Sequence, residues 1–565
     1  MLDIKALGAA EQFRNPRAGP KLFVSYVKKR LYLQDQTIIL MLRKLRITLG
    51  ILFFTGITLL LLDFTGALHC WLGWMAKIQF LPAVMALNVA VIAALVLVTL
   101  IFGRIYCSLI CPLGIFQDCI AHMGAASKRR HNNNKPYSWS PEKRWLRYIV
   151  WVLFVAALVI GINAIVALLA PYSAWGRIVQ NLLQPIVLLG NNLLAVIAEH
   201  TGSYAFYSRE VWIRSLPTFI IAAVTLIVLI ILAWRGGRTY CNTICPVGTT
   251  LSFFSRFAMF RPVIDADKCR NCKKCEHDCK ASCINIAKHK IDYSRCVDCF
   301  NCLEDCQFDA LKYRFAWGRA NTAKKTDTPQ VKGQNTRRAF ITGAALAAGS
   351  IALNAQKKKT DGGLAQLLDK KAPEREVPIT PPGSKSIKDF YQHCTACQLC
   401  VASCPNNVLR PSASLEHLMQ PEMSFERGYC RPECTRCSEV CPTGAISKIS
   451  REEKTSYHVG LASVNRELCV AENGVSCGNC ARQCPAGAIE MVSNGEGRHP
   501  VVNENLCIGC GACENLCPVR PLSAITVNGR HNHINDQSYG QKRLHKDIRR
   551  SRNRSRRRMR PDKER

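Results

Sequence analysis

The chain has 565 residues, of which 48% are hydrophobic, and its mean hydropathy is close to zero. Such a length accommodates several domains, and such a composition requires apolar and polar regions to be segregated along the chain. Thirty-one cysteines, bunched into short repeated runs, indicate metal binding and argue against the scattered disulfides of a small secreted scaffold. The net charge of +35 fits either nucleic-acid binding or a membrane protein with basic cytoplasmic loops.

Four stretches in the first half are apolar, nearly uncharged and close to the ~20 residues that cross a bilayer. Basic residues precede the first, separate the second from the third and follow the fourth. The positive-inside rule therefore predicts a four-helix membrane domain over residues 41–260, with the segment 1–40 and both ends of the bundle in the cytoplasm. The four stretches are 46–68, 80–102, 148–170 and 213–234.

A fifth apolar segment, 178–197, contains a proline, a glycine and several amides. We expect it to lie in the outer interface, because a crossing would place the two motifs described next on opposite faces of the membrane. A true fifth span is the alternative. Asp63, near the outer end of the first stretch, is a candidate for quinol binding and proton release together with His69 and Arg177. The alternative for Asp63 is a side chain that snorkels into the interface.

The second and fourth stretches end in nearly identical sequences, GRIYCSLICPLG and GRTYCNTICPVG. Cysteines four positions apart lie on one face of a helix, so two C-x3-C-P motifs predict four thiols below the bundle. Such thiols would form a redox dithiol couple or hold an additional cluster. These four residues are Cys107, Cys111, Cys241 and Cys245. Three cysteines outside every run are interpreted as buried structural thiols: Cys70, Cys119 and Cys283.

Residues 261–320 contain two runs with the spacing C-x2-C-x2-C-x3-C. In this spacing three cysteines bind one [4Fe-4S] cluster and the fourth binds the neighbouring cluster. Zinc is a poor alternative, because structural zinc sites pair two knuckles without a crossed fourth ligand. The predicted ligands of one cluster are Cys269, Cys272, Cys275 and Cys306. Those of the other are Cys296, Cys299, Cys302 and Cys279.

The four spans, the two C-x3-C-P motifs and the following cysteine runs resemble the NapH-type membrane ferredoxins of quinol dehydrogenases over residues 40–315. Related proteins act in nitrous oxide reduction, copper-oxidase assembly and organohalide respiration. Some of them attach a flavin at an S-G-A-T sequence, which is absent here, so no covalent flavin is expected. No haem is expected either, because the predicted spans contain no histidine and the chain contains no C-x-x-C-H.

Residues 337–356, RRAFITGAALAAGSIALNAQ, fit a twin-arginine export signal between the linkers 321–336 and 357–388. Clusters are assembled before export, so a periplasmic cluster protein needs a route for folded cargo. Leu353 occupies the place of a small residue in an A-x-A site, which predicts an uncleaved anchor. The alternative is an ordinary helix after a basic pair.

Residues 389–530 contain four further runs with sixteen cysteines, which predict four [4Fe-4S] clusters. The second and third runs have the widened spacings C-x3-C-x2-C-x3-C-P and C-x7-C-x2-C-x3-C-P. Together with the twin-arginine segment, they resemble the NapG-type polyferredoxins over residues 337–528. Spacing leaves two ways to cross the fourth cysteines, exchange between neighbouring runs or a nested arrangement, and the resemblance favours the nested form. The runs are Cys394, Cys397, Cys400 and Cys404; Cys430, Cys434, Cys437 and Cys441; Cys469, Cys477, Cys480 and Cys484; and Cys507, Cys510, Cys513 and Cys517.

The tail 531–565 is basic and poor in aromatic residues, and we expect it to contact anionic lipid or an acidic redox partner instead of nucleic acid. The expected fold is a membrane α-helical bundle of four spans plus α+β bacterial ferredoxin-like cluster domains with six [4Fe-4S] clusters in all. The two resemblances imply a fusion of two subunits in the inner membrane, with residues 261–320 cytoplasmic and 389–530 periplasmic. They imply electron transfer from a quinol such as menaquinol to a periplasmic reductase, of the Nap nitrate type, or its cytochrome. A redox assembly or maturation factor for a metalloenzyme is the alternative.

Overall fold

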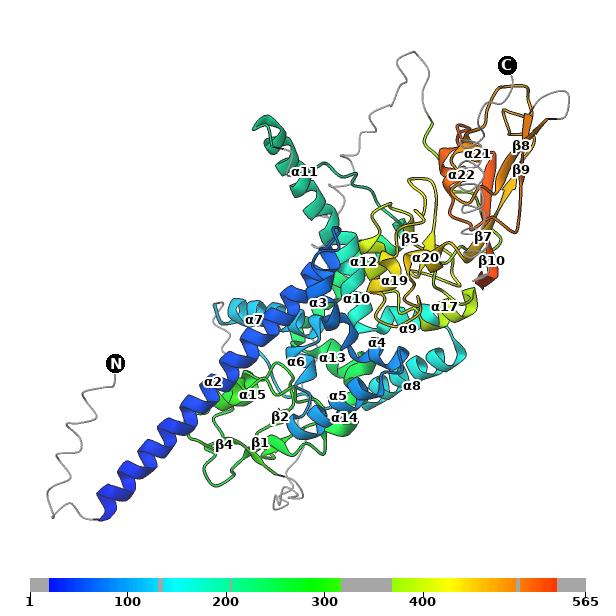
Figure 1. Cartoon of the computed structure of the whole chain (residues 1–565). Helices are drawn as coiled ribbons and strands as arrows, with labels where there is room; N and C mark the ends of the chain where they lie inside the picture. Colours follow the sequence, from blue (N-terminus) through cyan, green and yellow to red (C-terminus); the bar gives the residue numbers. More distant parts are fainter. Residues whose placement is uncertain (1–19, 131–135, 204–205, 317–367, 494–497, 536–565) are drawn as a thin grey trace, which may run out of the picture.

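The computed structural model describes residues 20–130, 136–203, 206–316, 368–493 and 498–535. They form a helical part (20–259), a first ferredoxin unit (260–316) and a second ferredoxin unit (368–535). Figure 1 shows the two ferredoxin units on opposite sides of the helical part. The predicted signal 337–356, the linker 321–336 and most of the tail 531–565 lie outside the described residues.

The first half of the helical part contains one long helix and several short ones. α2 (Pro20–Leu62) ends just before Asp63, whose carboxylate accepts backbone hydrogen bonds from the turn that follows. α5 begins after Asn88, whose side chain accepts a hydrogen bond from the Val91 N–H and caps the helix. The helices after α2 are α3 (His69–Lys77), α4 (Phe80–Met85), α5 (Val89–Phe102), α6 (Tyr106–Leu109) and α7 (Pro112–Arg130).

The second half turns back on itself between two long helices. α8 (Arg144–Ile160) ends at Gly161, whose φ of 90° is readily adopted only by glycine. α9 (Asn163–Leu169) follows, and its last carbonyl accepts a 3.1 Å hydrogen bond from the Tyr240 hydroxyl in the second C-x3-C-P motif. The remaining helices are α10 (Pro171–Ile178), the π-helical turn η2 (Val179–Leu183), α11 (Gln184–His200), α12 (Leu216–Gly236), α13 (Thr239–Thr243) and α14 (Pro246–Ser255).

The expected number of four spans is not confirmed. Among the described residues, three helices are long and apolar enough to cross a membrane, namely Leu40–Leu62, Pro171–His200 and Leu216–Gly236. The predicted span 80–102 is divided into α4 and α5, and the predicted span 148–170 is divided into α8 and α9. Hydropathy detects the apolar composition of both stretches but not the breaks within them.

The segment 178–197 is part of the continuous helix Pro171–His200. This helix is long and apolar enough to be a candidate span, as the alternative proposes, and the placement of the segment in the outer interface stays a prediction. The amides and the proline do not end the helix, because the backbone widens locally into the π-helical turn η2 before Pro185. Proline has no N–H for the Asn181 carbonyl, and a π-bulge is a common way to absorb that loss.

The first ferredoxin unit is a small α+β fold. Strand β1 (Phe260–Ile264) pairs antiparallel with β4 (Leu311–Phe315), so the two ends of the unit close on each other. Strands β2 (Ile284–Asn285) and β3 (Lys290–Ile291) pair between the cysteine runs. Each run leads into one short helix, α15 (Lys274–His277) or α16 (Asn301–Glu304).

The second ferredoxin unit repeats this design twice. Its strands pair antiparallel as β5 (Leu409–Pro411) with β6 (Pro421–Met423), β8 (Ile489–Ser493) with β9 (Arg498–Val502), and β7 (Tyr457–Val464) with β10 (Ile525–Asn535). The helices are α17 (Ile387–His393), α18 (Leu399–Ser403), α19 (Arg436–Val440), α20 (Arg451–Lys454), α21 (Asn479–Arg482) and α22 (Ala512–Leu516).

Both ferredoxin units pack directly on the helical part. On the side of the first unit, the Arg104 guanidinium donates to the Ser294 carbonyl at 2.9 Å. On the side of the second unit, the Asn181 amide donates to the Gln398 side chain at 3.0 Å, and Asn163 donates to a backbone carbonyl of α17. One buried hydrophobic cluster extends from the helical part into the second unit.

Candidate functional site

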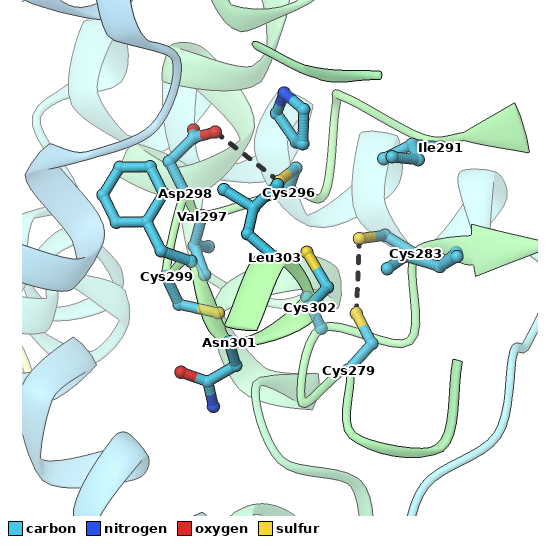
Figure 2. Close-up of a pocket in the computed structure, with 14 residues that line it drawn as sticks. Cys279, Cys283, Ile291, Cys296, Val297, Asp298, Cys299, Asn301, Cys302 and Leu303 are labelled. Atoms are coloured by element: carbon cyan, nitrogen blue, oxygen red, sulfur yellow. Dashed lines mark hydrogen bonds between the residues drawn. The ribbon is translucent and has the colours of Figure 1, made fainter. Parts of the chain in front are cut away.

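The structure places the cysteines of the first unit in two groups, each with a fourth member from the other run. In one group, Cys275 interacts electrostatically with the other three thiols. In the other group, the four cysteines line one apolar pocket (Figure 2). Set A is Cys269, Cys272, Cys275 and Cys306. Set B is Cys279, Cys296, Cys299 and Cys302. Both groupings match the predicted ligand sets, and ligation itself stays a prediction.

The loops that carry these cysteines have an unusual backbone. In four of the runs, the residues immediately before and after the second cysteine are left-handed, for example Asp298 and Phe300 with φ of 48° and 64°. Left-handed bulky residues are rare and cost conformational energy. The turns let three successive cysteines face one cavity. The other left-handed pairs are Asn271 and Lys273, Ala396 and Gln398, and Gly509 and Gly511.

Cys283 lies inside the first-unit site, although it was predicted to be a separate structural thiol. Its sulfur is 3.5 Å from that of Cys279, and it also hydrogen-bonds to Cys296. This contact lowers the pKa of Cys279 to about 7, which favours the thiolate that a metal ligand must be. The signal that we missed is its spacing, four residues after the last cysteine of a run.

The first two runs of the second unit exchange their fourth cysteines. Cys400 interacts electrostatically with Cys394, Cys397, Cys441 and Cys437, whereas Cys437 interacts with Cys430, Cys434 and Cys404. Set C is Cys394, Cys397, Cys400 and Cys441. Set D is Cys404, Cys430, Cys434 and Cys437.

The last two runs make the same exchange, and here cavities outline both sets. One pocket is lined by three cysteines of the fourth run and Cys484. Another is lined by three cysteines of the third run and Cys517. Set E is Cys484, Cys507, Cys510 and Cys513. Set F is Cys469, Cys477, Cys480 and Cys517.

The favoured nested arrangement is therefore wrong, and neighbouring runs pair instead. The physical reason is helix packing. α18 packs against α19, and α21 packs against α22, so each fourth cysteine at a helix end reaches the partner loop of its own pair. A nested exchange would require the first and fourth helices to pack together.

The C-x3-C-P cysteines, here called the repeat set, are brought together at the first-unit end of the helical part. All four are buried, at 3–4% exposure, and each interacts electrostatically with others of the set. The two motifs also hydrogen-bond to each other through their arginines. Arg104 of the first motif donates to the Cys241 carbonyl at 3.2 Å, and Arg238 of the second donates to the Cys107 carbonyl at 2.6 Å.

The donor chemistry of these sets fits polynuclear clusters. Within the described ranges, no three His, Cys, Asp or Glu side chains are close enough to hold a single metal ion. A cubane needs four thiols around a cavity, because its irons and sulfides lie between them. Burial raises the pKa of Cys275 to about 12 and that of Cys480 to about 11, and bound iron would offset this by keeping the thiols ionised.

Among the proposed quinol-site residues, His69 interacts electrostatically with Asp63, whereas Arg177 contacts the end of α9. The Asp63 carboxylate is buried and accepts four hydrogen bonds from the turn 65–68, which gives it a structural role as a turn cap. Arg177 donates to the carbonyls of Ala167 and Leu168 at the end of α9. His69 contacts the backbone at Glu439 in the second unit.

Comparison with known protein families agrees with the cysteine sets. A model described as a 4Fe-4S binding domain matches residues 84–131 and again 216–263, the two C-x3-C-P repeats. Two models described as 4Fe-4S dicluster domains match residues 393–445 and 475–520, and residues 292–408. The chain therefore carries several 4Fe-4S sites. No solved structure matches.

Characterised relatives match about a third of the chain or less, but most of their own length. The ferredoxin-type protein NapF of Escherichia coli K12 is 33% identical over 157 residues, 27% of this chain and 87% of that protein. NapG of the same strain is 30% identical over 208 residues, 33% of this chain and 83% of that protein. The methylamine utilization ferredoxin-type protein MauM of Methylobacillus flagellatus is 31% identical over 164 residues, 27% and 70% respectively. The chain thus belongs to the ferredoxin-type iron-sulfur electron-transfer proteins that include NapF, NapG and MauM.

Proposed function

We propose that this protein is a quinol dehydrogenase component of the inner membrane. Electrons pass from a quinol such as menaquinol, oxidised at the helical part, to a periplasmic terminal reductase of the Nap nitrate type or its cytochrome. The first ferredoxin unit is cytoplasmic and the second is periplasmic. Six [4Fe-4S] clusters, held by sets A to F, supply one-electron transfer when bound.

The observation that carries this proposal is the serial order of the cysteine sets. Set B contacts the helical part through Asp298, which hydrogen-bonds to the Arg104 backbone. On the other side, Gly176 of α10 packs against the Cys397 carbonyl of set C. The runs of sets C and D exchange their fourth cysteines, and so do the runs of sets E and F. The Cys430 N–H of set D donates to the Cys510 carbonyl of set E at 2.9 Å.

This order supports a fusion of two functions in one chain. The helical part and first unit resemble a NapH-type subunit, the second unit resembles a NapG-type polyferredoxin, and the chain matches NapG over 83% of the length of that protein. The internal twin-arginine segment is the expected junction, since it would direct the second unit to the periplasm. Set F, at the far end of the series, is then the exit to the partner.

The burial of the repeat set disfavours the alternative of a maturation factor. Such a factor would present the repeat-set thiols to another protein for reduction of a metal or disulfide. All four of these thiols are buried between α6, α7, α13 and α14, where a protein substrate does not reach them.

Membrane vesicles that contain the full chain test the proposal. Addition of menaquinol should reduce the clusters, as recorded by their visible absorbance, and a periplasmic acceptor should reoxidise them. A Cys477→Ala variant, which damages set F, should still be reduced by menaquinol but should lose reoxidation by the acceptor. The proposal would be contradicted if menaquinol does not reduce the clusters, or if a reporter fused after residue 530 proves to be cytoplasmic.

A further inference from the structure

The pocket of set B contains one sulfur more than a cubane needs. Cys279, Cys296, Cys299 and Cys302 supply four sulfurs, which is the full complement of a cluster held by cysteines. Cys283 lines the same pocket and is 2% exposed, although it belongs to no run. Its sulfur is 3.5 Å from the Cys279 sulfur, and Figure 2 shows the two sulfurs facing each other. Five cysteines therefore line a pocket for which four suffice.

The other runs show that packing alone does not require a sulfur at this position. Cys283 lies four residues after the last cysteine of its run, and a buried alanine occupies the same place after three other runs, namely Ala310, Ala445 and Ala488. The carbonyls of Cys283, Ala310 and Ala488 each accept a backbone hydrogen bond, at 2.9, 2.7 and 2.7 Å, from a residue just before a cysteine run. Cys283 thus adds one sulfur at a position where a methyl group completes the packing.

The backbone on both sides holds Cys283 at the pocket. The turn 279–283 packs against the start of α13, where the Arg238 N–H donates to the Lys280 carbonyl at 2.8 Å. The Lys280 side chain also pairs with Asp118 of α7 at 2.9 Å. On the other side, strand β2 follows Cys283 directly and pairs with β3. The place of the extra sulfur is therefore fixed by the fold.

The contact with Cys279 brings both sulfurs to the same corner of the pocket. Three cysteines of set B belong to one run, whereas Cys279 reaches the pocket alone from the other run. Two sulfurs 3.5 Å apart are in van der Waals contact, so they approach the same iron of a bound cubane. Cys283 also hydrogen-bonds to Cys296, but that cysteine is held in the three-cysteine loop by the left-handed turns at Asp298 and Phe300.

We propose that Cys283 is a reserve ligand of the set B cluster, which replaces Cys279 at the same iron when Cys279 dissociates. In this exchange the bond from iron to the Cys279 sulfur breaks, and a bond from iron to the Cys283 sulfur forms. The Cys283 thiol proton passes along the hydrogen bond between the two sulfurs to Cys279. No electron moves, and no other reactant is required. This inference rests on the proposed function, because it needs a cluster in set B.

Iron and acid-labile sulfide analysis of the purified full chain tests the exchange. Cys279→Ala and Cys283→Ala should each keep the iron content of the unchanged protein, because one of the two sulfurs remains. The double variant Cys279→Ala/Cys283→Ala should lose about four irons. Cys302→Ala is the matched control, since it removes a ligand of the three-cysteine loop and should also lose about four irons.

Two results for Cys279→Ala would overturn the proposal. The first is a loss of as many irons as in the double variant. The second is a loss of about one iron together with the electron paramagnetic resonance signal of a three-iron cluster, because Cys283 would then have left the vacant iron site open.

A second measurement leaves every ligand of set B in place. When an iron chelator is added, Cys283→Ala should release about four irons faster than the unchanged protein, because a dissociated Cys279 is no longer replaced. Cys70 and Cys119, the other cysteines outside every run, are exposed and not buried as predicted. Cys119→Ala is therefore the control and should release iron at the unchanged rate. Equal rates for Cys283→Ala and the unchanged protein would contradict a reserve ligand.

These outcomes are distinguishable from a failure of the proposed function. Loss of the set B cluster from Cys279→Ala overturns the reserve ligand alone, since the unchanged protein still holds its clusters. An iron content far below about 24 in the unchanged protein would overturn the proposed function as well.

Discussion

Single residues decide how the parts of this molecule are held together. Asp118 on α7 is the clearest case, since its carboxylate pairs with Arg238 at 2.6 Å, Lys280 at 2.9 Å and Arg46 at 3.3 Å. Burial alone would raise the pKa of this carboxyl, but the charges of Arg238 and Lys280 hold it well below its usual range. One carboxylate thus links both C-x3-C-P halves and the first ferredoxin unit.

We expect Asp118→Asn to lower the free energy of unfolding by about 3–5 kcal/mol, because three buried or half-buried cations lose their common counter-charge. Thermal unfolding in detergent, followed by loss of cluster absorbance, measures this. Glu199→Gln on α11 is the control, since Glu199 is exposed. Equal unfolding midpoints for the two variants would show that the charge network contributes little.

Asp63 and Cys283 show which contacts the sequence alone does not predict. Asp63 was predicted as functional because it is charged and near a membrane span, yet its four hydrogen bonds are local to the turn 65–68. Cys283 was set aside because it stands outside every run, yet it contacts two predicted ligands. Hydropathy and spacing do not record which groups a side chain contacts after folding.

At the scale of helices, the packing of α10 controls how the second ferredoxin unit docks. Gly176 lies in the middle of α10, and a Cβ at this position would overlap the Cys397 carbonyl oxygen. The close approach of backbone to backbone explains why a glycine occurs in this helix despite its cost in conformational entropy.

We therefore expect Gly176→Leu to weaken the docking of the second unit by about 1–3 kcal/mol through overpacking. Limited proteolysis should then cleave more readily around residues 368–386 in the variant than in the unchanged protein. Gly190→Leu on α11 is the matched control, because a Cβ there has open space around it. Identical cleavage rates for both variants would contradict the docking geometry.

The helices also explain which predictions from sequence hold. The cysteine runs and the grouping of three cysteines from one run with a fourth from the other follow from local spacing, so the four cysteines of set A and the four of set B were each predicted together. The helix boundaries at Gly161 and Asn88 are set by single residues, a left-handed glycine and a capping asparagine, and a hydropathy window averages over them. The pairing of runs in the second unit depends on which helices pack, and a resemblance to a family did not resolve it.

At the scale of the whole molecule, the pairing of runs predicts how many irons each cysteine variant loses. Cys404 and Cys430 both belong to set D, so the double variant Cys404→Ala/Cys430→Ala should lose one cluster, about four irons. Cys394→Ala/Cys404→Ala, which damages sets C and D, should lose about eight. A nested arrangement would instead place Cys404 and Cys430 in different clusters, and the first variant would then lose about eight irons.

The buried contacts between the helical part and the second unit have a kinetic consequence. Separate subunits must collide in or at the bilayer before an electron passes between them, and the rate then falls as the proteins are diluted in lipid. Here both partners are one polypeptide, joined through Asn163, Asn181 and Gly176. Under the proposed function, transfer between the two halves would be intramolecular, with a fixed one-to-one stoichiometry that does not change with expression level.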